Sequence, residues 1–141
     1  MRRIFWDTMV FAYWFEDHAL WGPRVERLFT EMERRGDVLC SSAVVLGELL
    51  VGPLKTGDRV AADAIERYFQ SGAVHLLPCP QKAARTFAEL RAEQGVKPLD
   101  ALHLATAAAS GVDAFVTNDR RLKSVVVPGI SFIATIESEL F

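Results

Sequence analysis

Cysteine is scarce in this chain, with only Cys40 and Cys79 among 141 residues. The two form no CxxC pair and have no histidine nearby at a metal-binding spacing, which argues against a structural zinc site. We expect Cys40 to pack as a small buried residue and Cys79 to lie in a Pro-Cys-Pro turn, with no disulfide between them.

Long hydrophobic runs are also absent, although 50% of the residues are hydrophobic. Each apolar run stops well short of the roughly 20 residues that a membrane-spanning helix needs, and the N-terminal MRRIFWD contains no signal-peptide core. Charged residues make up 24% of the chain, an ordinary share for a globular protein, which argues against disorder. We therefore expect a folded cytoplasmic protein that does not associate with membranes.

Short apolar runs alternate with longer helical patterns. Strands are predicted at residues 3–6, 38–40, 74–77, 114–117 and 130–133. Helices are predicted at residues 8–15, 23–35, 58–70, 80–94 and 98–110, and from Ser41 or Ser42 to about Gly52-Pro53. The strands are continuously apolar, as expected when helices cover both faces of a parallel sheet. The pattern predicts a three-layer α/β/α sandwich with a mostly parallel five-stranded sheet, formed as a single domain by residues 1–141.

Four carboxylates stand in or beside these apolar segments. Asp7 and Asp119 follow predicted strands, Glu48 lies within a helix, and Asp100 lies in the first turn of another helix. Acids in apolar surroundings lose hydration and repel each other, and a divalent cation offsets both costs. Because parallel strands end at one edge of the sheet, where ligands bind, we expect the four acids to meet there around Mg²⁺ or Mn²⁺.

Each acid also has a purely structural explanation. Asp7 can cap the helix that follows it, Asp100 suits the positive end of a helix, and Asp119 belongs to an Asn-Asp turn pair. A glutamate in mid-helix usually faces solvent, but Glu48 has apolar residues one turn away on both sides. His103, one turn after Asp100, is placed to pair with it. The agreement of all four acids in order and predicted edge favours the metal-site interpretation.

The net charge of −2 comes from 16 basic and 18 acidic residues, and at first it argues against a nucleic-acid partner. With four acids set aside as metal ligands, 14 acids remain against the 16 basic residues. The remaining surface is then slightly basic, so charge does not exclude RNA.

The fragments FWDT, GEL, PLDALHLATA and VTNDRRL, in this order, resemble the PIN domain. The resemblance is strongest to its compact bacterial and archaeal branch, the VapC-type toxins of toxin–antitoxin pairs, and it covers nearly the whole chain. It implies a metal-dependent ribonuclease with a parallel sheet sandwiched by helices. The family's acidic positions fall on the same four residues: Asp7, Glu48, Asp100 and Asp119. Its hydroxyl position falls on Thr117, which could hold a ligand or a water.

The chain departs from the family pattern at two positions. Many relatives have a small polar residue where this chain has Met9, and some have an acid where it has Arg121. The first departure indicates a local change beside the site, and the second leaves fewer ligands for a second metal ion. Neither removes one of the four acids.

The reaction that we expect is hydrolysis of an RNA phosphodiester. A metal held mainly by Asp7, Asp100 and Asp119 would activate a water, while Glu48 would position or deprotonate that water or bridge to a second ion. The resemblance implies 5′-phosphate and 3′-hydroxyl products. Basic residues that directly follow Asp119 are expected on the rim, in contact with the RNA backbone: Arg120, Arg121 and Lys123. Arg2 and Arg3 precede the first strand and are expected in solvent at the opposite edge.

The resemblance also implies protein partners. These are an antitoxin, with a segment that lies across the first helices and inserts an Arg or Lys near the acids, and a second copy of the chain bound around residues 52–68. Three aromatic residues of the first helices, Tyr13, Trp14 and Trp21, cannot all face inward, which indicates a partly exposed aromatic groove.

Other functions fit less well or differ in role. A haloacid-dehalogenase-like enzyme needs Asp-x-Asp after its first strand, where Met9 takes the second place. A response receiver needs an aspartate after its third strand, where this chain has Leu-Pro-Cys. Two alternatives stay open on the same fold: an RNA-processing nuclease without an antitoxin, and a catalytically silent module that binds RNA or protein. The presence of all four acids favours the enzyme.

Overall fold

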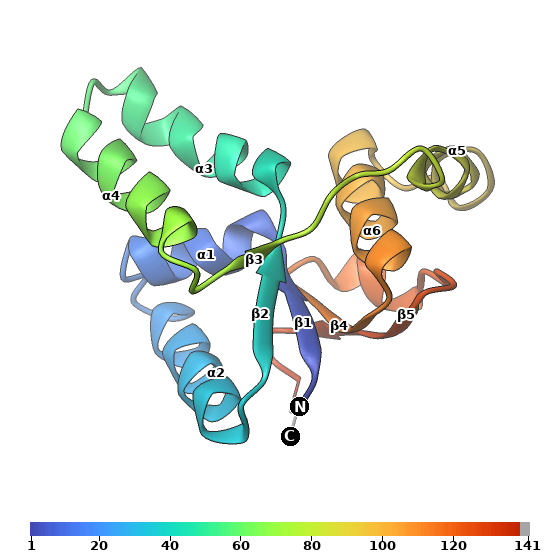
Figure 1. The fold of residues 1–141 in the computed structure, drawn as a ribbon, viewed down its shortest axis with the longest axis horizontal. Coiled ribbons are helices and arrows are strands. Elements are labelled where there is room, and N and C mark those ends of the chain that lie inside the picture. The colour runs from blue at the N-terminus through green and yellow to red at the C-terminus, as the bar shows by residue number, and fades with distance from the viewer. Residues whose placement is uncertain (139–141) are drawn as a thin grey trace.

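A computed structural model describes residues 1–138 of the chain and shows one sheet of parallel strands (Figure 1). The strands are β1 (Arg3–Trp6), β2 (Val38–Ser41), β3 (His75–Leu76), β4 (Val112–Thr117) and β5 (Ile130–Thr135). They lie in the order β3-β2-β1-β4-β5, and every neighbouring pair is parallel. The order places β1 and β4, which each lead into a predicted site acid, side by side at the centre.

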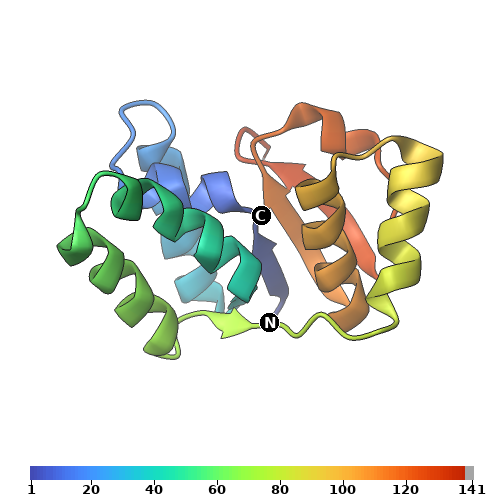
Figure 2. The same cartoon turned by 90° about the horizontal axis from the view of Figure 1, so that it is seen from above.

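Helices cover both faces of the sheet. They are α1 (Thr8–Phe15), α2 (Gly22–Arg35), α3 (Ala43–Lys55), α4 (Arg59–Gln70), α5 (Ala83–Gln94) and α6 (Pro98–Ser110), and a 3₁₀ helix, η1 (Arg120–Ser124), follows β4. Figure 2 shows α5 and α6 on one side of the sheet and α1 to α4 on the other. The predicted α/β/α sandwich is therefore confirmed. Within residues 1–138, no helix has the length and apolarity to cross a bilayer.

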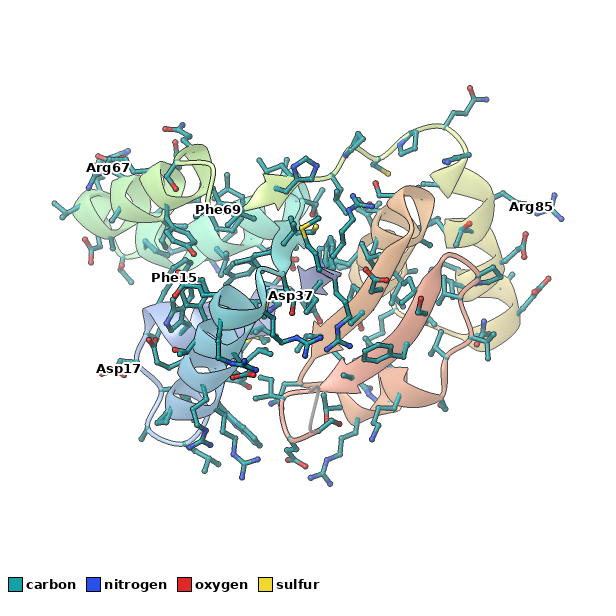
Figure 3. All side chains as sticks on the ribbon, turned by 60° about the horizontal axis from the view of Figure 1, so that its bottom comes forward. Phe15, Asp17, Asp37, Arg67, Phe69 and Arg85 are labelled. Atoms are coloured by element: carbon teal, nitrogen blue, oxygen red, sulfur yellow. The ribbon has the colours of Figure 1, made fainter. Side chains whose placement is uncertain are left out.

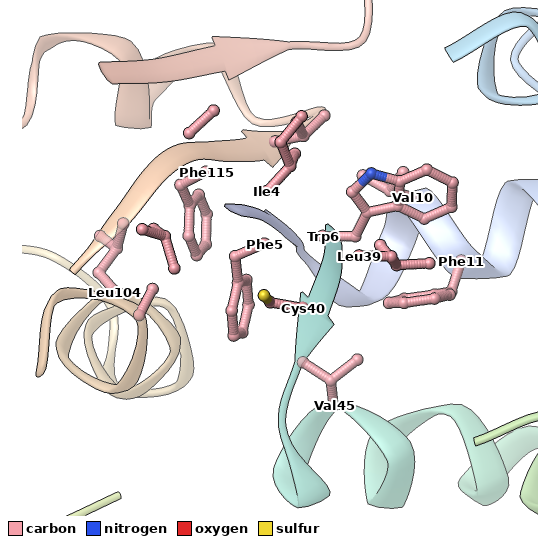
Figure 4. Close-up of a cluster of buried hydrophobic side chains, with 14 of the residues drawn as sticks. Ile4, Phe5, Trp6, Val10, Phe11, Leu39, Cys40, Val45, Leu104 and Phe115 are labelled. Atoms are coloured by element: carbon pink, nitrogen blue, oxygen red, sulfur yellow. The ribbon is translucent and has the colours of Figure 1, made fainter. Parts of the chain in front are cut away.

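The core lies on both faces of the central strands (Figure 4). Ile4, Phe5 and Trp6 of β1 are fully buried, although successive residues of a strand point to opposite faces. The Phe5 ring stacks on Phe115 of β4 with ring centroids 5.1 Å apart, and Trp6 packs on Phe11 of α1 at 5.1 Å. Helices on both sides thus explain why the strand sequence is continuously apolar.

Several predicted boundaries were wrong. β4 begins at Val112 instead of residue 114, and β5 ends at Thr135 instead of residue 133. α3 passes through Gly52-Pro53 to Lys55, because its last turn closes without a proline N–H: Thr56 N donates to Gly52 O (3.3 Å). α5 begins at Ala83 instead of residue 80, since Pro80 forms a turn in which its carbonyl accepts from Ala83 N (2.9 Å). β3 has only two residues, His75 and Leu76, instead of the four predicted, and it lies at one edge of the sheet. Cys40 is buried and Cys79 exposed, and both are free thiols as predicted.

Candidate active site

The four predicted acids line one cleft of about 410 Å³ at the carboxyl ends of β1 and β4. The cleft is lined by Asp7, Thr8, Met9, Tyr13, Glu48, Leu99, Asp100, His103, Thr117, Asn118, Asp119 and Arg120. The structure therefore brings together side chains separated by up to 112 positions, because parallel strands end at the same edge.

Asp7 is bound to both central strands. Its backbone N–H donates to the Val116 carbonyl (2.9 Å), which continues the β1–β4 pairing by one residue. Its Oδ1 accepts from the N–H of Thr8 (2.8 Å) and caps α1, while its Oδ2 accepts from the Thr117 hydroxyl (2.9 Å). The side chain is buried, and burial raises the pKa of Asp7 against the opposing effects of His103 and Thr117. The protein alone therefore does not fully offset the cost of burying a charged Asp7 side chain.

Glu48 shares one oxygen with two neighbours. The Thr8 hydroxyl donates to Glu48 Oε1 (2.7 Å), and His103 Nε2 lies 2.6 Å from the same oxygen. His103 was predicted to pair with Asp100, but its ring contacts Glu48 because α3 and α6 face each other across the cleft. His103 Nδ1 is buried without a hydrogen-bond partner among the described residues. Protonating Nδ1 would bury an unsatisfied N–H, so the tautomer with a donating Nε2–H is favoured.

Asp100 and Asp119 have opposite electrostatic surroundings. Burial and then the charge of Asp119 raise the pKa of Asp100, which lies in the first turn of α6. Hydrogen bonds from Arg121 hold the pKa of Asp119 below its usual range. The guanidinium covers both carboxylate oxygens, with Nε 3.0 Å from Oδ1 and Nη2 2.8 Å from Oδ2. The pKa values of the two acids therefore shift in opposite directions because, of the two, only Asp119 is hydrogen-bonded to a cationic side chain.

The acids do not form a closed metal cage as they stand. Within residues 1–138, no three acidic, histidine or cysteine side chains are grouped closely enough to enclose an ion. The Asp119 carboxylate is paired with Arg121, and the Glu48 carboxylate is hydrogen-bonded to Thr8 and His103. The donor set still fits Mg²⁺ or Mn²⁺, because these ions take a few carboxylate oxygens and keep several waters. Burial raises the pKa values of Asp7 and Asp100, so their charged forms are disfavoured, and a bound divalent cation would stabilise those charged forms.

The basic residues near the site have distinct partners. Arg120 lines the cleft and pairs with Glu137 (2.5 Å), and Arg121 pairs with Asp119. Lys123 is exposed on η1 beside Arg120. Of the three, only Arg121 is paired with one of the four acids, and it is the counter-ion of Asp119.

The expectation that Arg2 and Arg3 lie free in solvent was wrong. Arg3 Nη1 donates to the Ser110 carbonyl (2.6 Å), and the N–H of Arg3 donates to Asp113 (2.7 Å). The N–H of Arg2 donates to Asp37 (2.8 Å). Acids at the amino edge of the sheet bind this part of the chain, away from the cleft.

Sequence reasoning missed three polar residues of the cleft. The Thr8 hydroxyl bonds Glu48, and Asn118 Nδ2 donates to the Tyr13 hydroxyl (3.0 Å). Because Thr8 directly follows Asp7, the sequence already indicated that its hydroxyl lies near the site. The hydrogen bond between Asn118 and Tyr13 joins residues 105 positions apart, and no sequence pattern indicated it. Thr117, the hydroxyl position that the family resemblance indicates, is buried; its hydroxyl donates to Asp7 (2.9 Å) and accepts from the N–H of Asp119 (3.1 Å).

Comparison with protein families gives one match, to the family model described as the PIN domain, over residues 4–127. Three solved structures share the fold at low sequence identity. They are VapBC2 from Rickettsia felis bound to a DNA fragment from their promoter (TM-score 0.75, 20% identity, 94% of this chain and 98% of that chain), a toxin–antitoxin complex from Klebsiella pneumoniae (0.67, 17%, 90% and 94%), and the sarcin-ricin loop cleaving toxin VapC20 from Mycobacterium tuberculosis (0.64, 21%, 79% and 86%). No curated protein sequence matches the chain.

Proposed function

Because the chain belongs to the PIN domain family, we propose that it is an endoribonuclease that hydrolyses RNA phosphodiester bonds with the help of Mg²⁺ or Mn²⁺. The observation that carries this proposal is the convergence of Asp7, Glu48, Asp100 and Asp119 on one cleft. Two of these acids have raised pKa values, as expected for a site built for a cation.

Asp7, Asp100 and Asp119 would hold the ion. When bound, such an ion lowers the pKa of a water and polarises a phosphoryl oxygen. Asp7 gives a fixed position at the floor, because its carboxylate is held by Thr8 and Thr117. Asp119 is available once Arg121 leaves it, and the released guanidinium can then contact a phosphate of the substrate.

Glu48 would orient the attacking water and accept its proton. Its Oε1 already accepts two donors, from Thr8 and His103, which fixes the carboxylate plane and leaves Oε2 without an assigned donor among the described residues. A carboxylate held in this way points in one direction, as a general base must to reach the proton that it abstracts.

We propose that the biological role is that of a toxin neutralised by an antitoxin. Two of the structures that share the fold are toxin–antitoxin complexes by their descriptions. An apolar groove of about 480 Å³ lies between α1, α3 and α4, and Thr8 and Glu48 line both this groove and the cleft. A segment that occupies the groove would therefore reach the acids.

The groove differs from the aromatic surface expected from the sequence. It is lined by residues such as Met9, Phe15 and Ile65, whereas Trp14 packs on Trp6 and Phe29 at centroid distances of 5.6 and 4.6 Å.

A gene for a small DNA-binding protein directly upstream, whose product inhibits the purified enzyme, would support the toxin role. Absence of such an inhibitor would favour an RNA-processing enzyme.

A homodimer is proposed through the end of α3 and through α4. Three apolar side chains are exposed there: Val51 by 51%, Leu54 by 48% and Val60 by 79%. Apolar side chains grouped on a surface indicate a contact with another protein. Light scattering of the Leu54→Lys variant tests this contact: we expect a monomer where the wild type is a dimer. A monomeric wild type at micromolar concentration would remove the dimer proposal.

The experiment for the nuclease proposal compares cleavage of labelled tRNA and rRNA in Mg²⁺, in Mn²⁺ and in EDTA. The control is the Asp7→Asn variant, which keeps the helix-capping oxygen but loses the charge. We expect cleavage by the wild type only with metal, and none by the variant. Cleavage in EDTA, or equal cleavage by the variant, contradicts the mechanism, and no cleavage of any RNA favours a silent binding module.

A further inference from the structure

A groove along α2 carries more basic side chains than the proposed reaction uses. It has a volume of about 720 Å³ and runs between one face of α2 and the ends of β4 and β5. Four arginines of α2 line it: Arg24, Arg27, Arg34 and Arg35. The whole chain has a net charge of −2, so this concentration of positive charge is local and does not reflect the composition.

The arginines share a face because of their spacing. Arg24 and Arg27 are three residues apart, and Arg27 and Arg34 are seven apart, or about two turns. Arg35 directly follows Arg34, and Leu28 and Glu31 lie in the same stripe between the two pairs. Successive turns of a helix are about 5.4 Å apart, so Arg24 and Arg27 lie about one turn apart, and Arg34 with Arg35 lies about two turns further along the groove. Donors spread along one helix face in this way match a ligand that carries several anions along its length.

Two of these charges lack an acidic partner. Within residues 1–138, no ion pair joins Arg24 or Arg27 to a carboxylate, whereas Arg34 pairs with Glu31 and Arg35 with Asp37. The Arg24 guanidinium instead lies over the Trp21 ring, 5.4 Å from its centroid, which holds it near the start of α2. Uncompensated guanidinium groups in a groove favour an anionic ligand.

A third hollow lies between the α2 groove and the cleft and shares lining residues with each. Arg120 lines the cleft and also a hollow of about 440 Å³ over η1, where Lys123 is its neighbour. Thr135, Glu137 and Ser138 line both that hollow and the α2 groove. A chain that leaves the acids can therefore pass Arg120 and Lys123 on its way to the groove.

We propose that the α2 groove binds the sugar–phosphate backbone of the RNA beyond the bond that is cut. This inference rests on the proposed nuclease function and adds to it a binding path. Arginine binds phosphate with two parallel hydrogen bonds, and such contacts give affinity without base choice. Arg24 and Arg27 carry most of the effect, since their charges are not neutralised within the described protein.

The test measures binding of a fluorescent 20-nucleotide single-stranded RNA over a range of salt concentrations. The variant combines Arg24→Gln and Arg27→Gln in the inactive Asp7→Asn background, so that binding is measured without cleavage. We expect affinity at low salt to fall about tenfold and the slope of log K against log salt to become shallower by about 1.4, as two lost phosphate contacts on a single strand require. An unchanged affinity and slope overturn the proposal.

The matched control removes the same charge elsewhere. The control combines Lys82→Gln and Arg85→Gln in the same background. Arg85 lies on the far side of the sheet from α2 (Figure 3). We expect this control to bind RNA like its parent, with both proteins melting at the temperature of the parent. An equal loss in the control would show a general charge effect and also overturn the proposal.

Cleavage separates failure of the groove from failure of the nuclease proposal. With Asp7 restored, the Arg24/Arg27 variant should cleave a four-nucleotide RNA like the wild type and a 20-nucleotide RNA with a raised KM and an unchanged kcat. If the wild type cleaves nothing, the binding measurement still decides the groove. If the variant binds RNA normally but loses affinity for an acidic peptide, the surface belongs to a protein partner and the RNA path is wrong.

Discussion

Nε2 of His103 lies 2.6 Å from Oε1 of Glu48, although the two residues are 55 positions apart. The Thr8 hydroxyl donates to the same oxygen (2.7 Å), so a helix on each side of the cleft fixes one carboxylate. The orientation of Glu48 thus depends on α1 and α6 as much as on its own helix, α3.

The first prediction concerns these two donors. Thr8→Val and His103→Leu each remove one hydrogen-bond donor to the Glu48 carboxyl group, a loss of about 1.5–3 kcal/mol that should lower kcat roughly tenfold to a hundredfold. His103→Gln keeps an N–H near the Nε2 position and should recover most of the activity. The measurement is steady-state cleavage of a short RNA.

Thr106→Val serves as the control for that prediction. Thr106 is a buried threonine of the same helix, but its hydroxyl donates to the Leu102 carbonyl (2.8 Å) and not to the site. It should change stability without changing kcat. If His103→Gln is as inactive as His103→Leu, hydrogen bonding to Glu48 is not the role of His103.

The second prediction concerns Arg121, which competes with a metal ion for Asp119. Its side chain is 68% exposed, so solvent screens the ion pair and a metal ion can displace the guanidinium. Arg121→Gln should therefore bind Mn²⁺ about two- to fivefold more tightly, as measured by calorimetry. Arg120→Gln, which breaks the pair with Glu137, should leave metal affinity unchanged. Weaker metal binding by Arg121→Gln would contradict competition at Asp119.

The third prediction is stabilisation by metal. Binding at tenfold excess over Kd should add about 1.4 kcal/mol to the free energy of unfolding of the wild type. Asp7→Asn should lose most of this gain, because it removes the buried ligand. The comparison is of melting temperatures in EDTA and in Mn²⁺. An equal shift in Asp7→Asn would place the ion elsewhere.

The fourth prediction is a dependence on pH in the absence of metal. The folded-state pKa of Asp7 is raised, so the folded protein binds its proton more readily than the unfolded chain does. The charged form is therefore destabilising at neutral pH, and this cost disappears as pH falls through the raised pKa. In EDTA, Asp7→Asn should be more stable than the wild type at pH 7.5, with a smaller difference at pH 5. A difference that grows toward pH 5 would contradict the raised pKa.

Much of the arrangement could be predicted from the sequence because parallel strands impose a common edge. Asp7 and Asp119 follow adjacent central strands, so topology alone brings them near each other. The contact between Glu48 and His103 could not be predicted, since it depends on how α3 and α6 face each other. The pairing of Arg121 with Asp119 is local, but sequence does not show whether that guanidinium prefers the acid or the substrate.

The different attachment of the three proposed ligands has a consequence for ion choice. Asp7 is anchored to the paired backbones of β1 and β4, while Asp100 stands on α6 and Asp119 on the turn that starts η1. A cation of larger ionic radius can then be accommodated by displacement of the two outer carboxylates alone. Complexes with Mg²⁺ and with Mn²⁺ should therefore superimpose at Asp7 and differ at Asp119, because only the outer carboxylates would move to fit the larger ion.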